Sequence, residues 1–239
     1  MLRGASTLAD VSETKVLTPQ QVEFYRTFGF LRLPGVFTEE VAEIEQAFES
    51  VFADETNDRF DIDVELHGNQ PRVVIPQFLG RHPFLAGLLD DPRVTGIVGD
   101  LLGPDAEYAE SDGNLYWCDS EWHCDVFGSP LEIRHLKLAF YLDRLDADNG
   151  AVRVIPGTNH WSSAYATGLR QNFLRIGESA SVYGLEGNEI PSVVLESEPG
   201  DLLMWDFRTL HAVYHGMPRR RLFTVNFREA TSVPAVNGA

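Results

Sequence analysis

The residue pattern of this chain changes near residue 107, and that change constrains the fold more than any other feature. Before it, apolar side chains recur at helical spacing, as in the stripe Val41, Ile44, Phe48, Val51 and Phe52. After it, short apolar, β-branched or aromatic runs are separated by turn residues, which is typical of β-strands. The sequence therefore predicts an α+β chain whose second half is an antiparallel sandwich or barrel.

Three helices are predicted in the first half of the chain. The first begins at Thr18, whose side chain can cap it, and ends before Gly29. The second begins at 38–40, where acidic residues suit the positive end of a helix, and the third runs from Asp91 to Gly103. A strand and turn are expected after the first helix, and later strands are expected at 136–142, 151–155, 192–196, 201–205 and 222–227.

The length of 239 residues fits a single domain, 1–239, of this kind. We expect a helical flank with early strands over about 18–106 and the β core over about 107–228. Residues 162–191 interrupt the strand rhythm for too long to be an ordinary connection, so they are predicted to form a lid. Three polar stretches are expected to be flexible, namely 1–15, 55–70 and 231–239.

The composition argues against several classes of protein. The chain has 19 Lys+Arg against 36 Asp+Glu, a net charge of −17, which argues against binding to a nucleic-acid backbone. No apolar run is long enough to cross a bilayer, and no secretory signal is evident. Cys118 and Cys124 alone cannot make a disulfide framework. We therefore expect a cytoplasmic protein without nucleic-acid or membrane partners, whose oligomeric state the sequence does not indicate.

The run Trp122-His123-Cys124-Asp125 has the clearest chemical meaning. On an extended strand, side chains two apart project from the same face, so His123 and Asp125 converge while Cys124 points away. A third ligand from a neighbouring strand, such as His211, would complete two histidines and one carboxylate on one face of a metal. This facial triad holds non-haem Fe(II) and leaves other coordination positions open.

Alternatives to this metal site stay open from spacing alone. A His-x-Asp pair occurs often by chance, and His211 is one of seven histidines. His211 and His215 have the spacing of a metal pair on a helix, although their context indicates a strand end and a turn. Four other histidines are expected to be exposed or hydrogen-bonded structural residues, namely His67, His82, His135 and His160.

Four stretches resemble the phytanoyl-CoA dioxygenase family of Fe(II)/2-oxoglutarate-dependent oxygenases, namely 122–125, 136–161, 199–213 and 218–227. Family members share a Trp-His-x-Asp strand, an Asn-Gly turn followed by a Pro-Gly stretch ending in His, and a Gly-Asp strand before a distal His. They also carry an Arg at the beginning of the last strand. The resemblance covers roughly 18–228, and it implies a double-stranded β-helix, the cupin-like jelly roll, with N-terminal flanking helices.

The resemblance implies iron as the metal, with His123, Asp125 and His211 as its ligands. Related halogenases replace the carboxylate with Gly or Ala, so Asp125 keeps the oxygenase pattern. No catalytic residue beyond the metal centre is implied.

The resemblance also implies a site for 2-oxoglutarate. The family's Arg lies seven residues before an aromatic residue of the last strand, which gives Arg220, and a guanidinium suits the distal carboxylate. Arg219 and Arg221 stay alternatives, although period two places Arg221 on the opposite sheet face. Arg72 lies where some members carry a Lys that reaches the cosubstrate.

The implied function is hydroxylation of an unactivated C–H bond in a small organic molecule, such as a natural-product intermediate. The reaction would consume O2 and 2-oxoglutarate and release succinate and CO2. Ala139 and Val213 depart from the family, which often has a Trp and a small hydroxyl residue there. They leave two alternatives open: a non-catalytic jelly-roll binding protein, and a cupin-like metalloenzyme that uses no oxo acid. Arg170 and Arg175, in the predicted lid, are expected to be solvated rather than to bind an anionic substrate.

Overall fold

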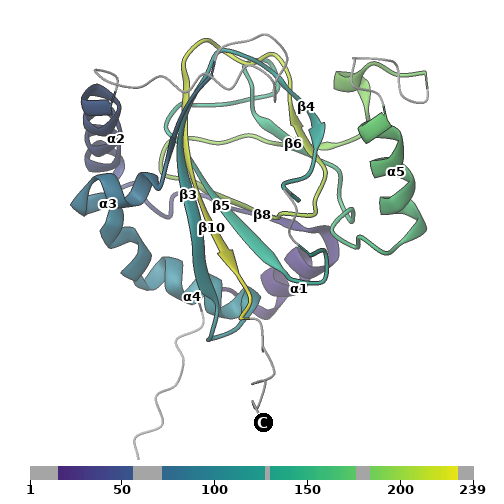
Figure 1. Ribbon diagram of the computed structural model, residues 1–239, viewed down its shortest axis with the longest axis horizontal. Coiled ribbons are helices and arrows are strands. Elements are labelled where there is room, and N and C mark those ends of the chain that lie inside the picture. Colours follow the sequence, from purple (N-terminus) through teal and green to yellow (C-terminus); the bar gives the residue numbers. More distant parts are fainter. Residues whose placement is uncertain (1–15, 56–71, 127–129, 176–183, 231–239) are drawn as a thin grey trace, which may run out of the picture.

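The computed structural model describes residues 16–55, 72–126, 130–175 and 184–230 (Figure 1). Five α-helices lie in these ranges: α1 Pro19–Phe28, α2 Val41–Glu55, α3 Pro83–Gly87, α4 Pro92–Leu102 and α5 Ala164–Arg175. Three 3-10 helices accompany them: η1 Phe78–Arg81, η2 Leu88–Asp90 and η3 Gly187–Glu189. No helix in the described ranges is both long and apolar enough to cross a membrane.

Two antiparallel sheets form the body of the molecule. The larger has the order β1-β8-β5-β10-β3-β2, with bounds Phe30–Leu33, Leu202–Asp206, His135–Tyr141, Arg220–Arg228, Glu107–Tyr116 and Arg72–Pro76. The smaller has the order β4-β9-β6-β7, with bounds Ser120–His123, His211–Val213, Val152–Val154 and Val193–Leu195. This mainly antiparallel core confirms the predicted fold class, the jelly roll, and the two sheets do not close into one barrel.

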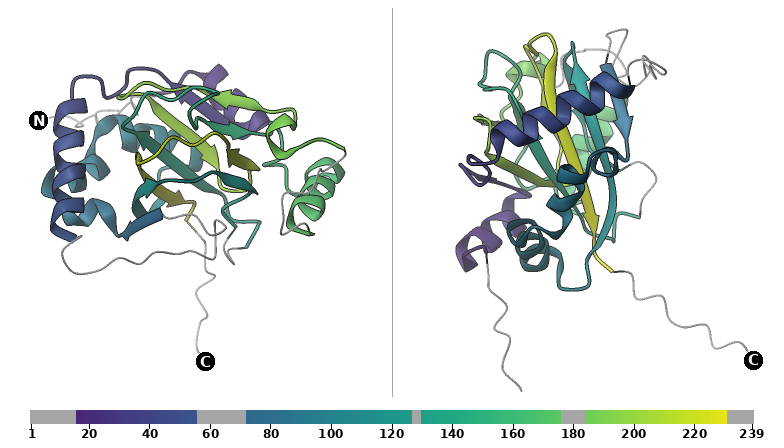
Figure 2. Two further views of the ribbon diagram at one scale, coloured as in Figure 1. Left: turned by 90° about the horizontal axis from the view of Figure 1, so that it is seen from above. Right: turned by 90° about the vertical axis from the view of Figure 1, so that its left-hand side faces the viewer.

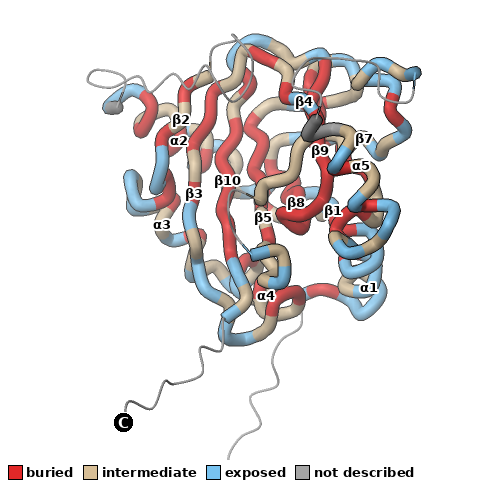
Figure 3. The backbone as a smooth tube through the Cα atoms, turned by 45° about the vertical axis from the view of Figure 1, so that its right-hand side comes forward, coloured by how far each residue is buried: buried red, intermediate tan, exposed pale blue. Residues whose placement is uncertain are grey.

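The helices cover the six-stranded sheet on its outer side. Figure 2 shows α2, α3 and α4 gathered against this sheet, and α5 beside the smaller one. The residues between helices and sheet are almost all apolar and include Phe48, Phe78, Ile97, Leu138 and Phe223. Figure 3 shows the resulting contrast between buried sheet strands and helices with exposed outer surfaces. A second apolar cluster fills the space between the two sheets, so the side chains of β5 alternate between two interiors.

Local sequence signals locate two helices correctly. The Thr18 hydroxyl accepts a hydrogen bond from the Gln21 amide, the Gln21 side-chain oxygen accepts one from the Thr18 amide, and Gly29 ends α1 at φ 84°. Asp91 caps α4 through the Arg93 amide. These two predictions are confirmed.

Other predictions differ in extent. The second helix begins at Val41 rather than at 38–40, because residues 34–40 form turns. The five later strands are confirmed within one or two residues. Neither β2 nor the ten-residue strand β3 is predicted individually by the residue pattern. The predicted flexible stretches 1–15 and 231–239, and nearly all of 55–70, lie outside the described residues.

The segment 162–191 contains α5 and η3, with residues 176–183 outside the described part. Its Ile190 packs in a small apolar cluster with Trp122, and Leu169 packs against that cluster. The expectation for Arg170 is wrong, because its side chain is buried and donates to the carbonyls of Trp161, Thr158 and Arg208. The buried guanidinium fixes α5 to neighbouring turns and meets neither solvent nor an anion.

Candidate metal and cosubstrate site

The antiparallel pairing of β4 with β9 sets His123 directly opposite His211. The two rings lie with their centroids 4.2 Å apart. Asp125 follows the end of β4, and its amide donates to the Phe207 carbonyl at 2.8 Å. One ligand atom from each of His123, Asp125 and His211 lies within 4.8 Å of the others. Backbone pairing thus brings together residues that are almost ninety positions apart in the chain.

Both imidazoles are oriented through Nδ1. His211 Nδ1 contacts the Thr209 carbonyl at 2.9 Å, and His123 Nδ1 contacts the Glu121 carbonyl at 2.6 Å. His211 Nε2 then lies 3.6 Å from an Asp125 carboxylate oxygen. Burial lowers the pKa of His211 to about 3 and also lowers the pKa of His123. Near neutral pH both rings are therefore uncharged, which is the form that binds metals.

Two residues hold the Asp125 carboxylate from the larger sheet. Lys137 of β5 places its Nζ 2.8 Å from Oδ2, and Trp205 of β8 donates from Nε1 to the same oxygen at 3.2 Å. Burial alone would raise the pKa of Asp125, but the Lys137 ammonium and the two histidines hold it well below its usual range. The carboxylate is therefore ionised and aimed at the histidines before any metal binds.

These three residues fit a divalent metal of the iron type. Two neutral nitrogen donors and one anionic oxygen donor form a facial set, and such a set suits non-haem Fe(II). Hydrogen bonds at the second nitrogen of a ligating histidine and at a ligating carboxylate are typical of protein metal sites. A cavity of about 140 Å³ opens beside the three ligands.

The three consecutive arginines take different directions. Arg220 is 2% exposed and lines the cavity. Arg221 points to the opposite face, as period two predicts, and pairs with Asp143 and with two glutamates of α2. Arg219 is a surface residue at φ 56°, paired with Glu49. Only Arg220 of the three shares a cavity with the metal-ligand candidates.

Arg220 has the environment of a carboxylate-binding residue. Its NH1 donates to the Gly150 carbonyl at 3.2 Å, whereas its buried Nε has no hydrogen-bond partner among the described residues. Its guanidinium lies 5.3 Å from the centre of the Tyr116 ring. Arg72 also lines the cavity and donates to the Tyr116 hydroxyl at 3.2 Å. A buried guanidinium with an unpaired donor suits an anionic ligand.

A model of the phytanoyl-CoA dioxygenase (PhyH) family matches residues 25–214. The chain belongs to this family. It is thereby an enzyme of the iron- and 2-oxoglutarate-dependent dioxygenase class.

Solved structures support the fold of this PhyH-family chain. The α-ketoglutarate-dependent carbocyclase SnoK from nogalamycin biosynthesis is 22% identical, with TM-score 0.69, over 91% of this chain and 87% of that one. EctD from S. alaskensis is 20% identical, with TM-score 0.67, over 92% of this chain and 79% of that one. HygX from Streptomyces hygroscopicus, solved with nickel and 2-oxoglutarate bound, is 21% identical, with TM-score 0.68, over 90% and 88%. No curated protein matches the chain.

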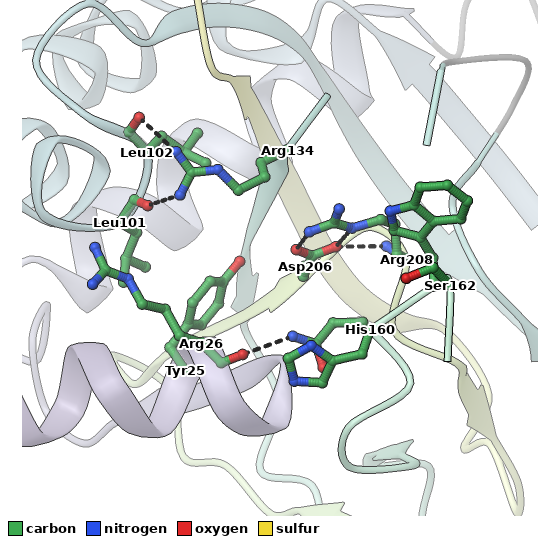
Figure 4. A pocket seen from close by; sticks show the side chains of 11 residues that line it. Tyr25, Arg26, Leu101, Leu102, Arg134, His160, Ser162, Asp206 and Arg208 are labelled. Atoms are coloured by element: carbon green, nitrogen blue, oxygen red, sulfur yellow. Dashed lines mark hydrogen bonds and ion pairs between the residues drawn. The ribbon is translucent and has the colours of Figure 1, made fainter. Parts of the chain in front are cut away.

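The loop that leads to His211 is fixed from behind the sheet. Figure 4 shows Asp206 held by the Arg208 side chain in a second cavity of about 220 Å³, next to Tyr25 of α1. Arg208 donates from its amide and from Nε to Oδ1 of Asp206, at 2.9 and 2.8 Å. Thr209 donates its hydroxyl to the Gly29 carbonyl. This cavity holds none of the metal-ligand candidates, so its polar groups serve to position the strand that carries His211.

Several site residues carry no recognisable sequence signal. Lys137, Trp205 and Thr224 line the metal cavity from strands that the apolar pattern predicts, and Asp112 lines it from β3, which the pattern does not predict. Period two would have put Lys137 on the same face as Ala139 and Tyr141, but not beside Asp125. Val213 lines the cavity too, whereas Ala139 is fully buried. The predicted lid, in its described part, contributes no lining residue, so its role stays a prediction.

Proposed function

We propose that this PhyH-family enzyme is a non-haem Fe(II)- and 2-oxoglutarate-dependent oxygenase that oxidises a C–H bond of a small organic molecule, with hydroxylation as the outcome. The observation that carries the proposal is one cavity that joins His123, Asp125 and His211 to the buried Arg220. When bound, iron and the oxo acid supply the oxidising chemistry, with succinate and CO2 as co-products. The chain's own residues bind these groups and orient the substrate.

Each of these residues has a role that follows from its contacts. His123, Asp125 and His211 would hold the metal, with Lys137 and Trp205 keeping the Asp125 carboxylate in place. Arg220 would bind the distal carboxylate of 2-oxoglutarate through its unpaired Nε, and Arg72 would reach the same cosubstrate. Structures of similar fold support these roles, because EctD has been solved with 2-oxoglutarate and 5-hydroxyectoine and HygX with nickel and 2-oxoglutarate.

The site of action proposed is the cytoplasm. Cys118 and Cys124 are both free thiols, as is ordinary in a reducing compartment. The proposed substrate partner is a small molecule, in line with EctD, which has been solved with 2-oxoglutarate and 5-hydroxyectoine.

The proposal is tested with Asp125→Ala, which removes the anionic ligand. Under anaerobic conditions, Fe(II) and 2-oxoglutarate should give the wild type a weak visible charge-transfer band, and the variant should lose it. Succinate release with substrate present should fall more than about 100-fold, since even changes around a metal ligand cost 10- to 100-fold.

Asp105→Ala is the matched control, because Asp105 is an exposed turn carboxylate with no part in the cavity. A folded Asp125→Ala protein that still made succinate at the wild-type rate would contradict the proposal. A wild type without the band and without a thermal shift on adding metal and 2-oxoglutarate would favour the non-catalytic binding protein.

A further inference from the structure

Asp112 faces the metal cavity from the larger sheet. It lies in the middle of β3, where Asp112, Asn114 and Tyr116 alternate with residues that face the helices, and all three line the cavity. β10 pairs Asp112 with Thr224, and Thr224 with Ala139 of β5. The row that crosses the sheet at this level therefore carries a carboxylate, a hydroxyl and a methyl group.

The Asp112 carboxylate has no partner among the residues that the structure describes. No hydrogen bond or ion pair joins its side chain to any of them, and the cations that line the cavity are engaged elsewhere. Lys137 pairs with Asp125, Arg72 donates to the Tyr116 hydroxyl, and Arg220 donates to the Gly150 carbonyl. A partly buried carboxylate without a hydrogen-bond or ion-pair partner is unfavourable, so this one is suited to a positive charge that arrives with a ligand.

Two further oxygen acceptors lie next to this carboxylate. Thr224 is 6% exposed, lines the cavity, and its hydroxyl takes part in no hydrogen bond with the described residues. Asn114 lies two residues from Asp112 on the same face of β3 and donates its Nδ2 to the Asp112 backbone carbonyl, which turns its own Oδ1 the other way. An anionic oxygen with two neutral acceptors matches an ammonium group, which has three donors.

Loading the site does not itself neutralise Asp112, because iron brings two positive charges and 2-oxoglutarate two negative ones. Burial and the neighbouring Glu110 raise the pKa of Asp112, while Lys137 and Arg72 act against this. A cation beside Asp112 would remove the cost of burying it.

We propose that Asp112, with Thr224 and Asn114, binds a protonated amine of the substrate, so that the enzyme acts on amino compounds. This inference rests on the proposed function, because it places the substrate in the metal cavity. Asp112 is then a specificity-determining residue, and the amine fixes which C–H bond faces the metal ligands. Arg220 begins β10 on the same face, four residues before Thr224, which separates the amine from the cosubstrate carboxylate.

The test uses pairs of compounds that differ in one charged group: ethanolamine and ethylene glycol, 4-aminobutan-1-ol and 1,4-butanediol, glucosamine and glucose, L-lysine and L-norleucine. Two readouts are taken for each compound, the shift in melting temperature of the metal-free protein and the stimulation of succinate release by the loaded enzyme. We expect at least one amine to act at a concentration about tenfold or more below that of its neutral partner, as a charged hydrogen bond would give.

Asp112→Asn should abolish this preference, and Asp105→Asn should keep it, because Asp105 is exposed and outside the cavity. Asp112→Ser is the second variant if the Asn variant does not fold. The inference is overturned if no pair shows an amine preference, or if the preference persists in a folded Asp112 variant. The anaerobic charge-transfer band separates the two proposals: its absence defeats the iron and 2-oxoglutarate assignment, while the melting shifts still test Asp112.

Discussion

The two sheets of this enzyme differ in what they contribute. The six-stranded sheet has strands of four to ten residues, and its outer face packs against α2, α3 and α4 through apolar side chains. The four-stranded sheet has strands of three or four residues, yet it carries His123 and His211 on paired positions. The short sheet can hold the two proposed histidine ligands accurately because the larger sheet, through Lys137 and Trp205, holds the Asp125 carboxylate beside them. The larger sheet thus packs on the helices with its outer face, and the proposed metal ligands lie where the two sheets meet.

The largest expected effect is on the outer face of the larger sheet. Phe223 of β10 is fully buried, stacks on Phe140 with centroids 4.5 Å apart, and also contacts Phe78. Phe223→Ala should lower the free energy of unfolding by about 3–5 kcal/mol, because it leaves a cavity in the core. Denaturant unfolding measures this.

The matched control is Tyr165→Ala, since Tyr165 is 53% exposed and should change stability by no more than about 0.5 kcal/mol. The folded fraction of Phe223→Ala should keep the iron and 2-oxoglutarate band. If Phe223→Ala lost the band while keeping the stability of the wild type, the separate roles assigned to the two sheets would be contradicted.

A smaller effect is expected where the larger sheet enters the site. Arg220→Met should raise the KM for 2-oxoglutarate on the order of 10- to 100-fold, since it removes charge-assisted hydrogen bonds. Stability should change little, because replacing a buried charge by an apolar chain of similar length is often neutral. Succinate formation against cosubstrate concentration measures the first, and denaturant unfolding the second.

Arg219→Met is the control, because its ion pair with Glu49 is at the surface and such pairs contribute at most about 1 kcal/mol. The roles assigned to Arg220 and Arg219 would be reversed if the control raised the KM and Arg220→Met did not.

The smallest effect is expected in the helical layer. Asp91→Ala removes the cap of α4 and a bond to Arg93, and should cost about 1 kcal/mol of stability at neutral pH without affecting the metal site. The Arg93 guanidinium holds the pKa of Asp91 below its usual range, with burial acting against it.

A carboxyl group with a lowered folded-state pKa stabilises above its unfolded pKa, and this contribution is lost as pH falls through the folded pKa. The stability difference between wild type and Asp91→Ala should therefore shrink below about pH 4. A difference that grew on acidification would contradict this origin.

The parts of the fold that the sequence predicts are determined by interactions within a few residues. The parts that it does not predict are determined by contacts between distant segments. Thr18 and Gly29 act within one turn of a helix, so their sequence context was sufficient. β3 reads poorly because it alternates polar cavity residues with small ones, and only its pairing with β2 and β10 makes it a strand. Arg170 was misread because its partners are backbone carbonyls of other turns, which no side-chain pattern reveals.

The site divides in the same way. Spacing alone suggested that His123 and Asp125 share a face, and resemblance to the family supplied His211 and Arg220. Lys137 and Asp112 stayed unnoticed because their meaning depends on strand order: β10 separates them in the sheet, and the cavity exists only once the smaller sheet closes over it. A charged residue in a strand gives no sign of which cavity it will face.

Gly150 has a consequence for anyone who redesigns this enzyme. A Cβ atom there would lie 2.5 Å from NH1 of Arg220, and the residue holds φ at 105°, where side chains are strained. The turn before β6 therefore looks like a convenient surface loop for grafting or library diversification, but it forms the wall against which the Arg220 guanidinium rests. If Arg220 binds the cosubstrate as proposed, randomising that turn would alter cosubstrate affinity first, so a campaign aimed at new substrates should hold Gly150 fixed and vary the face around Asp112 instead.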